Sequence, residues 1–320
     1  MPSALDAFWG WPPPVLDPAG PYASSVTTLA WVLLAMGVLV TGVVLVALYV
    51  AVKGPPRLKA MLGGERAVWI GGIIFPGVVL TGLLIWGLTL TASLTKPITG
   101  NEMRVRVTGE MWWFRVQYLD PQGRVILEDA NELHLPVGER VVIELRSADV
   151  IHNFWIPNLS GKKDMVPGRI NLLPIQADKA GRFGGFCAEY CGGPHALMGF
   201  VAVAHPRAQF DAWLASHRAG PRRGPRTPEL ANGRRLFMER GCAACHRVAG
   251  TEANGAAGPD LTHMGTRLTV GAGILPNNRG TLTGWIGDSQ SIKPGNRMPT
   301  YDMLSASDLN AIAAWLEQPR

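Results

Sequence analysis

Two cysteines, a histidine and a methionine form a soft set of metal donors within twelve residues of the chain: Cys187, Cys191, His195 and Met198. Soft donors of this kind favour copper over magnesium or calcium. A mononuclear blue-copper site uses one cysteine, two histidines and a weak methionine. This stretch instead supplies two cysteines four positions apart. Two thiolates can bridge two copper ions and spread one electron over both, which predicts electron transfer rather than substrate chemistry.

Such a site needs a second histidine, and His152 is the candidate. It follows a strand-like run at residues 141–145 and precedes a Trp-Ile-Pro break at Trp155. A lone histidine in this setting is more often a hydrogen-bonded core residue. Its pairing with the cysteine stretch is what makes His152 a predicted metal ligand.

A second reactive motif, Cys242-Ala-Ala-Cys245-His246, fits the attachment pattern of a c-type haem. The two thiols would form thioethers with the haem vinyl groups, and the imidazole would bind the iron. A redox dithiol and half of a zinc site are the alternatives. Neither fits well, because no second cysteine pair follows and no βαβ pattern surrounds the motif.

The sixth iron ligand is predicted to be Met298, which lies between a Pro-Gly pair and Pro299 in a loop expected to be rigid. Ligation by Met and His raises the haem potential, which suits an electron carrier. Met264, Met303 and His263 are the rival ligands.

Two apolar segments are long enough to cross a membrane. Residues 27–52 and 68–94 each exceed the roughly 20 residues that a spanning helix needs. The connector between them carries four basic residues against one acid, and the first 26 residues carry no Lys or Arg. The positive-inside rule therefore places the connector in the cytoplasm and the rest outside. Two buried helices of a soluble core are the alternative.

The remainder of the chain predicts two further domains. Short alternating stretches at 105–204, separated by Gly and Pro turns, predict an antiparallel β-sandwich, followed by a helix near 209–216. After a Pro/Gly/Arg-rich linker, Thr227-Pro-Glu predicts a helix start, and Ser305–Gln318 predicts an amphipathic helix. The predicted parts are an N-terminal segment at 1–26, a helical hairpin at 27–94 and a sandwich at 95–217. A linker at 218–226 and an all-α domain at 227–320 follow.

Composition excludes one class of function. The net charge is +6, but the Lys and Arg residues are scattered and form no long run, so nucleic-acid binding is not expected. A disulfide module with a zinc-binding tail is a further alternative. It is disfavoured because cysteine pairs this close would restrain little chain entropy.

The metal-donor pattern resembles the dinuclear CuA site of cytochrome c oxidase subunit II, and the likeness covers roughly residues 25–210. It implies a cupredoxin-like sandwich in which two thiolates bridge the copper ions and two imidazoles bind at the ends. It also implies a weak thioether ligand, a backbone carbonyl ligand, and a magnesium ion shared with subunit I at the glutamate carboxylate. Carried over by position, the bridging thiolates are those of Cys187 and Cys191, and the terminal imidazoles are those of His152 and His195. Met198 is the weak thioether ligand, and Glu189 supplies both the backbone carbonyl and the carboxylate that faces magnesium.

Two further parts of the resemblance concern electron flow. Trp112 resembles the tryptophan at which electrons enter from cytochrome c, although Glu110 and Met111 depart from the family's usual flanking residues. An ordinary core tryptophan is the alternative. The segment 258–261 resembles class I cytochrome c, in which the proline carbonyl, here that of Pro259, orients the axial histidine.

The resemblance implies an oxidoreductase subunit of a bacterial caa-type oxidase in the inner membrane, with both cofactor domains on the outer side. Electrons from cytochrome c or a quinol-oxidising complex would enter through haem c. They would pass through copper to subunit I, where oxygen is reduced to water and protons are pumped; subunit III would be a further partner. A subunit of a copper-containing nitric oxide reductase and a membrane-tethered carrier are the alternatives, although a single helix would suffice as a tether.

Overall fold

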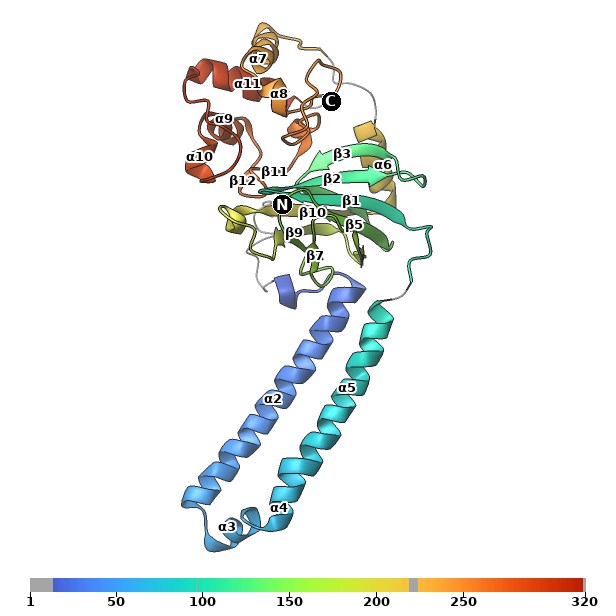
Figure 1. Ribbon diagram of the computed structural model, residues 1–320, viewed down its shortest axis with the longest axis vertical. Helices are drawn as coiled ribbons and strands as arrows, with labels where there is room; N and C mark the ends of the chain where they lie inside the picture. The colour runs from blue at the N-terminus through green and yellow to red at the C-terminus, as the bar shows by residue number, and fades with distance from the viewer. Residues whose placement is uncertain (1–13, 96, 219–223, 319–320) are drawn as a thin grey trace. The chain divides into compact units, whose positions relative to one another are not determined.

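The computed structural model describes residues 14–95, 97–218 and 224–318 (Figure 1). Contacts divide the chain into two units, residues 24–98 and the remainder. The first 13 residues of the predicted N-terminal segment and residues 219–223 of the predicted linker lie outside the described residues. The two units are described separately.

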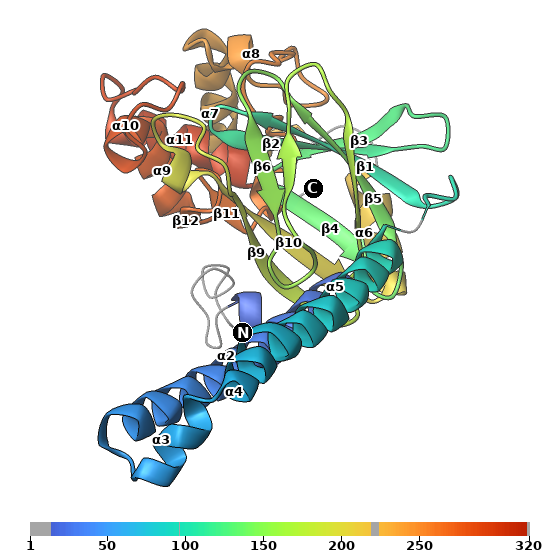
Figure 2. The same ribbon diagram turned by 60° about the horizontal axis from the view of Figure 1, so that its bottom comes forward.

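The smaller unit is built on two long helices, α2 and α5, which run alongside one another in opposite directions (Figures 1 and 2). Both are long and apolar enough to cross a membrane. Large apolar side chains are exposed along both, as at Leu39, which is 67% exposed. Such surface requires a cover of lipid or protein. The helices of this part are α2 Pro21–Lys53, α3 Pro56–Leu62, α4 Glu65–Trp69, the π-helical turn η2 Ile70–Ile74 and α5 Phe75–Leu94.

The helix that contains the second apolar run begins at Glu65, three residues before that run starts at Val68. A single π-helical turn at Ile70–Ile74 connects α4 to α5. This turn lies directly ahead of Pro76, which has no backbone N–H to continue the α-helical pattern. Wide turns of this kind accommodate such an interruption without ending the helix.

The larger unit contains a sandwich of two five-stranded sheets. The first, in the order β3-β2-β1-β5-β8, comprises β1 Met103–Glu110, β2 Trp113–Leu119, β3 Val125–Ala130, β5 Val141–Ser147 and β8 Asn171–Ile175. The second, in the order β4-β10-β9-β6-β7, comprises β4 Glu132–Pro136, β6 His152–Trp155, β7 Lys163–Met165, β9 Gly181–Cys187 and β10 Gly199–His205. Neighbouring strands are antiparallel except β1 with β5 and β4 with β10. The predicted sandwich is confirmed, with these two parallel pairs as its departures.

The sandwich core packs directly beneath the metal-donor residues. Phe114 of β2, Phe154 of β6 and Phe200 of β10 are fully buried, with ring centroids 4.7–6.1 Å apart. A Cβ on Gly185 would lie 2.2 Å from the Phe200 ring, so only glycine admits this contact. The rigid core therefore fixes the ends of β6 and β9, where His152 and Cys187 are located. Helix α6, Arg207–Arg218, follows β10 and extends beyond the predicted 209–216.

The C-terminal domain is mainly helical, as expected, with one short ribbon. Helices α7 and α11 pack so closely that a Cβ on Gly233 would lie only 2.0 Å from the Ala311 carbonyl oxygen. The absence of a side chain at Gly233 therefore permits this packing. Both helices begin with a side-chain cap, because the Thr227 and Ser305 side chains accept hydrogen bonds from Leu230 N and Asp308 N. The elements are α7 Pro228–Glu239, α8 Cys242–Cys245, η4 Met264–Thr266, β11 Thr269–Val270, β12 Leu275–Pro276, α9 Arg279–Gly287, α10 Ser289–Ile292 and α11 Ala306–Glu317.

Candidate functional site

The six predicted copper donors lie together at one end of the sandwich. Cys187 Sγ is 3.8 Å from Cys191 Sγ, 3.9 Å from His152 Nδ1 and 3.2 Å from the Glu189 carbonyl oxygen. Cys191 Sγ is 3.4 Å from His195 Nδ1 and 3.8 Å from Met198 Sδ. Residues from β6, β9, the following loop and the short 3-10 helix η3, His195–Leu197, thus converge on the two sulfur atoms.

The separation of the two sulfur atoms tests the disulfide alternative. Cys187 and Cys191 are free cysteines, and 3.8 Å is well beyond the 2.05 Å of an S–S bond. A metal ion about 2.3 Å from each sulfur, as is usual for a thiolate ligand, fits this spacing. The spacing is therefore that of two free thiols with room for a metal ion between them.

The two thiols differ in electrostatic environment. A hydrogen bond from the Cys191 thiol lowers the pKa of Cys187 to about 3. Burial opposes this shift, and a hydrogen bond from His152 adds to it. The same contact with the Cys187 thiolate, together with burial, raises the pKa of Cys191. A second thiolate at this spacing is thus unfavourable unless a cation lies between the sulfurs.

Asp149 orients His152 from behind. Its Oδ1 lies 2.8 Å from His152 Nε2, and its Oδ2 accepts a 2.8 Å hydrogen bond from the Met111 backbone N–H. Burial lowers the pKa of His152, but hydrogen bonds with Cys187 and Asp149 outweigh it, and the net pKa is raised. This contact directs Nδ1 toward the sulfur atoms, the usual role of a carboxylate behind a metal-binding histidine.

Trp112 lies directly on the metal-donor loop. Its indole N–H donates a 3.0 Å hydrogen bond to the carbonyl oxygen of Cys191. A Cβ on Gly193 would lie 3.3 Å from the indole ring, so small residues let the ring approach the loop. The structure therefore brings Trp112 to the predicted copper ligands rather than into the sandwich centre.

The predicted haem-attachment residues are arranged around the short helix α8. Cys242 is buried and Cys245 is exposed. The Nδ1 of His246 lies 2.8 Å from the Pro259 carbonyl oxygen, which leaves Nε2 free to bind a metal. Burial lowers the pKa of His246, which favours the neutral imidazole that ligation requires. A Cβ on Gly258 would lie 2.6 Å from the His246 ring, so glycine lets the chain pass beside it.

The rival sixth ligands differ in their surroundings. Met298 is half-buried against the C-terminal core, and its N–H and carbonyl are held by Asn296 and Ser289. Met264 Sδ instead lies 3.8 Å from the Arg267 guanidinium. Met303 is 73% exposed, and His263 stacks on His217 at 4.4 Å. Met298 remains the predicted ligand, and its backbone is held on both sides.

Residues that the sequence did not single out join the helical domain to the sandwich. Arg267 and Asp129 form a buried ion pair at 2.6 Å. Leu268 N–H donates to Glu132 Oε2 at 2.8 Å, and Lys293 Nζ donates to the Trp112 carbonyl at 2.7 Å. These residues form no motif and come from distant parts of the chain, so no local pattern indicates them.

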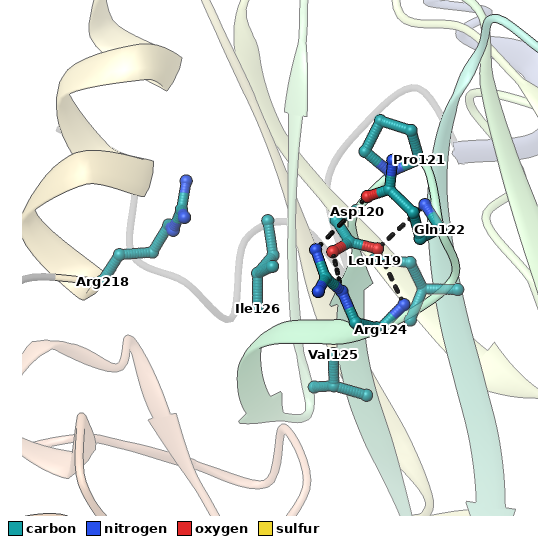
Figure 3. Close-up of a pocket in the computed structure, with 8 residues that line it drawn as sticks. All are labelled: Leu119, Asp120, Pro121, Gln122, Arg124, Val125, Ile126 and Arg218. Atoms are coloured by element: carbon teal, nitrogen blue, oxygen red, sulfur yellow. Dashed lines mark hydrogen bonds and ion pairs between the residues drawn. The ribbon is translucent and has the colours of Figure 1, made fainter.

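A hollow of about 580 Å³ lies at the end of β2 away from the metal-donor loop (Figure 3). Asp120 there accepts hydrogen bonds from the Arg124 side chain and backbone, which close the β2–β3 turn. Its lining contains neither a cysteine nor a histidine. None of the described residues that line the hollow is therefore a soft donor for copper.

Comparisons with known proteins agree with this geometry. Residues 103–205 match the family described as "Cytochrome C oxidase subunit II, periplasmic domain", and residues 230–319 match "Cytochrome c". The chain is 36% identical over 313 residues to "Cytochrome c oxidase subunit 2" of Alkalihalophilus pseudofirmus, covering 94% of this chain and 89% of the relative. The chain belongs to the cytochrome c oxidase subunit 2 family. It is also 31% identical to the Bacillus subtilis protein of that name, covering 82% of this chain and 78% of the relative.

Among solved structures, the periplasmic domain of subunit II of cytochrome oxidase from Bradyrhizobium japonicum matches with a TM-score of 0.34 and 29% identity. The match covers 36% of this chain and 93% of that one. As a cytochrome c oxidase subunit 2 with a cytochrome c domain, the chain is a subunit of the oxidase complex, and its two apolar helices fit membrane anchoring.

The subunit 2 and cytochrome c domains imply copper and haem, and the residues present fit both groups. Two thiols, two imidazoles, a thioether and a carbonyl converge at one place, which is a donor set for copper. Two thiols next to a histidine whose Nε2 is free fit an attached haem.

Proposed function

We propose that this oxidase subunit carries electrons from outside the membrane to the oxygen-reducing partner subunit, in three stages. Electrons enter the cytochrome domain from cytochrome c or a quinol-oxidising complex. They cross to the sandwich beside Trp112 and leave through the metal-donor loop to subunit I, where oxygen reduction is coupled to proton pumping. The convergence of all six predicted donors on Cys187 and Cys191 carries this proposal.

The sandwich would hold a dinuclear copper centre. Cys187 and Cys191 would bridge the two ions, with His152 and His195 as terminal ligands. Met198 and the carbonyl of Glu189 would be the weak ligands. When bound, the centre supplies one-electron redox chemistry. The side chains around it keep the donors in place: Asp149 holds His152, and the phenylalanine core fixes β6 and β9.

The cytochrome domain would hold a covalent haem c through thioethers to Cys242 and Cys245, with His246 and Met298 as iron ligands. The Pro259 carbonyl oxygen accepts a hydrogen bond from His246 Nδ1, which keeps the ring proton on Nδ1 and leaves Nε2 for the iron. Asn296 and Ser289 brace the backbone of Met298, which limits how far its thioether can move.

The exit side is proposed from a hollow of about 520 Å³ beside the metal-donor loop, lined by residues that include Val150, Ile151, Glu189 and Tyr190. Ile151 and Tyr190 are 46% and 75% exposed, a large apolar surface beside a polar site. Subunit I would cover this surface, and the Glu189 carboxylate would share a magnesium ion with it. Subunit III would complete the complex, with both domains on the outer face of the bacterial inner membrane.

The deciding experiment is electron paramagnetic resonance of the oxidised full chain in detergent, with haem attached and copper loaded. We expect one unpaired electron shared by two equivalent copper nuclei, beside a low-spin haem signal. Cys191→Ser should abolish the shared-copper signal and leave the haem signal. A mononuclear copper signal in the wild-type protein would overturn the dinuclear assignment.

The iron ligand is tested separately. Met298→Ala should abolish the sulfur-to-iron charge-transfer absorption of the oxidised haem, whereas Met264→Ala should retain it. The opposite result would identify Met264 as the ligand.

A further inference from the structure

Lys293 is a buried lysine at the contact between the cytochrome domain and the sandwich. It follows α10 and is 3% exposed. Its Nζ donates to the carbonyl oxygens of Trp112, at 2.7 Å, and Gly271, at 3.2 Å. Within the described ranges of the chain, no carboxylate forms an ion pair with it. Its hydrogen-bond partners are two backbone carbonyls, one from each domain.

Lys293 is the first residue of the loop that carries Met298, the proposed iron ligand. Asn296 Nδ2 donates to the Lys293 carbonyl at 2.8 Å, and Asn296 Oδ1 accepts from the Met298 N–H at 2.8 Å. The same Nδ2 donates to the Ser289 carbonyl at 2.9 Å. This asparagine ties both ends of the loop together, so the position of Lys293 and that of Met298 are linked.

Trp112 continues the connection on the other side. Its carbonyl accepts from Lys293, and its indole N–H donates to the Cys191 carbonyl at 3.0 Å. A continuous series of hydrogen bonds and short backbone segments thus runs from Met298 through Asn296, Lys293 and Trp112 to Cys191.

A lysine is a costly residue for this position. Burial of an ammonium group without a carboxylate is unfavourable, and a methionine would fill similar space without that penalty. Burial lowers the pKa of Lys293 to about 7, in spite of the opposing charge of Cys191. What lysine provides and methionine lacks is a set of donors that reaches a carbonyl in each domain.

We propose that Lys293 is a positioning residue for electron transfer between the two domains, because its ammonium group fastens the Met298 loop to the Trp112 carbonyl. This inference rests on the proposed function. The group holds a distance and an orientation; it neither carries the electron nor binds copper or iron. Its loss should slow transfer and leave the ligands of both redox centres in place.

Docking of the domains does not depend on Lys293 alone. The Arg267–Asp129 ion pair, the Leu268 N–H to Glu132 contact and the Gly199 N–H to Ala272 carbonyl contact at 3.0 Å join the same two domains. A variant without the lysine amine should therefore remain docked, which separates positioning from assembly.

The test compares the full chain, loaded with copper and haem, with its Lys293→Met variant. The haem is reduced by a photoexcited ruthenium complex, and its reoxidation is followed together with copper reduction. We expect the interdomain rate to fall several-fold, because electron transfer between two centres slows as the distance between them increases. The haem reduction potential and the copper resonance signal should match the wild type. Because the charges of Lys293 and Cys191 interact, the copper reduction potential is measured as well, and the rates are compared after correction for any change in driving force. Lys162→Met, at an exposed lysine, is the control and should leave the rate unchanged.

Amide hydrogen exchange of Leu268 and Gly199, which donate across the contact, reports docking in the same samples. A wild-type rate in Lys293→Met would overturn the proposal. A slow rate accompanied by loss of protection at Leu268 and Gly199 would also overturn it, since the lysine would then serve assembly. If Lys293→Met does not incorporate haem, Lys293→Gln, which is too short to span both carbonyls, replaces it. Failure of the wild-type chain to show the shared-copper signal would refute the proposed function instead.

Discussion

The guanidinium of Arg267 lies 2.6 Å from the carboxylate of Asp129, and both side chains are almost fully buried although 138 residues separate them. Burial raises the pKa of Asp129, and the charge of Arg267 opposes that rise. Arg267 also donates to the Asp260 carbonyl. The guanidinium thus joins a strand of the sandwich to two loops of the cytochrome domain.

Removal of one member of this pair should loosen the contact between the domains. Arg267→Met leaves the Asp129 carboxylate buried and unpaired, which typically costs about 3–5 kcal/mol. Amide exchange at Leu268, which donates to Glu132 across the contact, measures the loss. Arg124→Met, at a pair whose arginine is 77% exposed, is the control and should change stability by less than about 1 kcal/mol.

A double variant, Arg267→Met with Asp129→Leu, removes both charges and should recover much of the lost protection. Wild-type exchange in the single variant would show that the ion pair does not hold the domains together.

Asp149→Asn should weaken copper binding, because His152 would lose the carboxylate that orients it. Loss of such a partner typically costs about 10–100-fold in metal affinity. Competition with a copper chelator, followed by copper absorbance, measures the change. Asp178→Asn, at an exposed residue of the same sandwich, should bind copper as the wild type does. Equal affinity in both variants would remove Asp149 from the site.

Gly258→Ala should disturb haem ligation. The added Cβ would lie 2.6 Å from the His246 ring, so the ring or the chain beside it must shift. We expect a destabilisation of about 1–3 kcal/mol, typical of overpacking, and partial conversion of the haem to high spin. Visible absorption during thermal unfolding shows both effects. Gly284→Ala has open space around it and should keep the haem low-spin. An unchanged spectrum in Gly258→Ala would contradict the packing argument.

His205 should make the sandwich sensitive to acid. Burial and the neighbouring His134, whose Nδ1 is 2.7 Å from His205 Nε2, lower the pKa of His205 to about 4. An unfolded histidine has a pKa near 6.5, so between pH 6.5 and 4 the unfolded chain binds more protons. Stability should therefore fall as the pH drops through this range.

The His205 contribution is isolated by comparison with His205→Gln, which cannot take up the proton. Thermal loss of copper absorbance at pH 7.5 and 4.5 measures it. We expect a larger acid-induced drop in midpoint temperature for the wild type than for His205→Gln. Equal drops would show that another group governs the response.

The clustering of the proposed copper donors could be predicted because most lie within one short loop. His152 joins them from the first residue of β6. The haem motif and the ends of α7 and α11 are likewise local patterns of neighbouring residues. The Arg267–Asp129 and Lys293–Trp112 contacts could not be predicted, because pairing across distant loops leaves no spacing or periodicity in the sequence. For the same reason, the sequence could not predict that the Trp112 indole donates a hydrogen bond to the Cys191 carbonyl.

The proposed electron input also differs kinetically from that of a subunit with a separate donor. A free cytochrome must find its acceptor by collision, so its delivery rate depends on its concentration and on salt. Here the last donor is part of the same chain and is held by an ion pair shielded from solvent. Delivery to the copper site should then follow first-order kinetics that neither dilution nor ionic strength alters, and the collisional step moves outward to whichever molecule reduces the cytochrome domain.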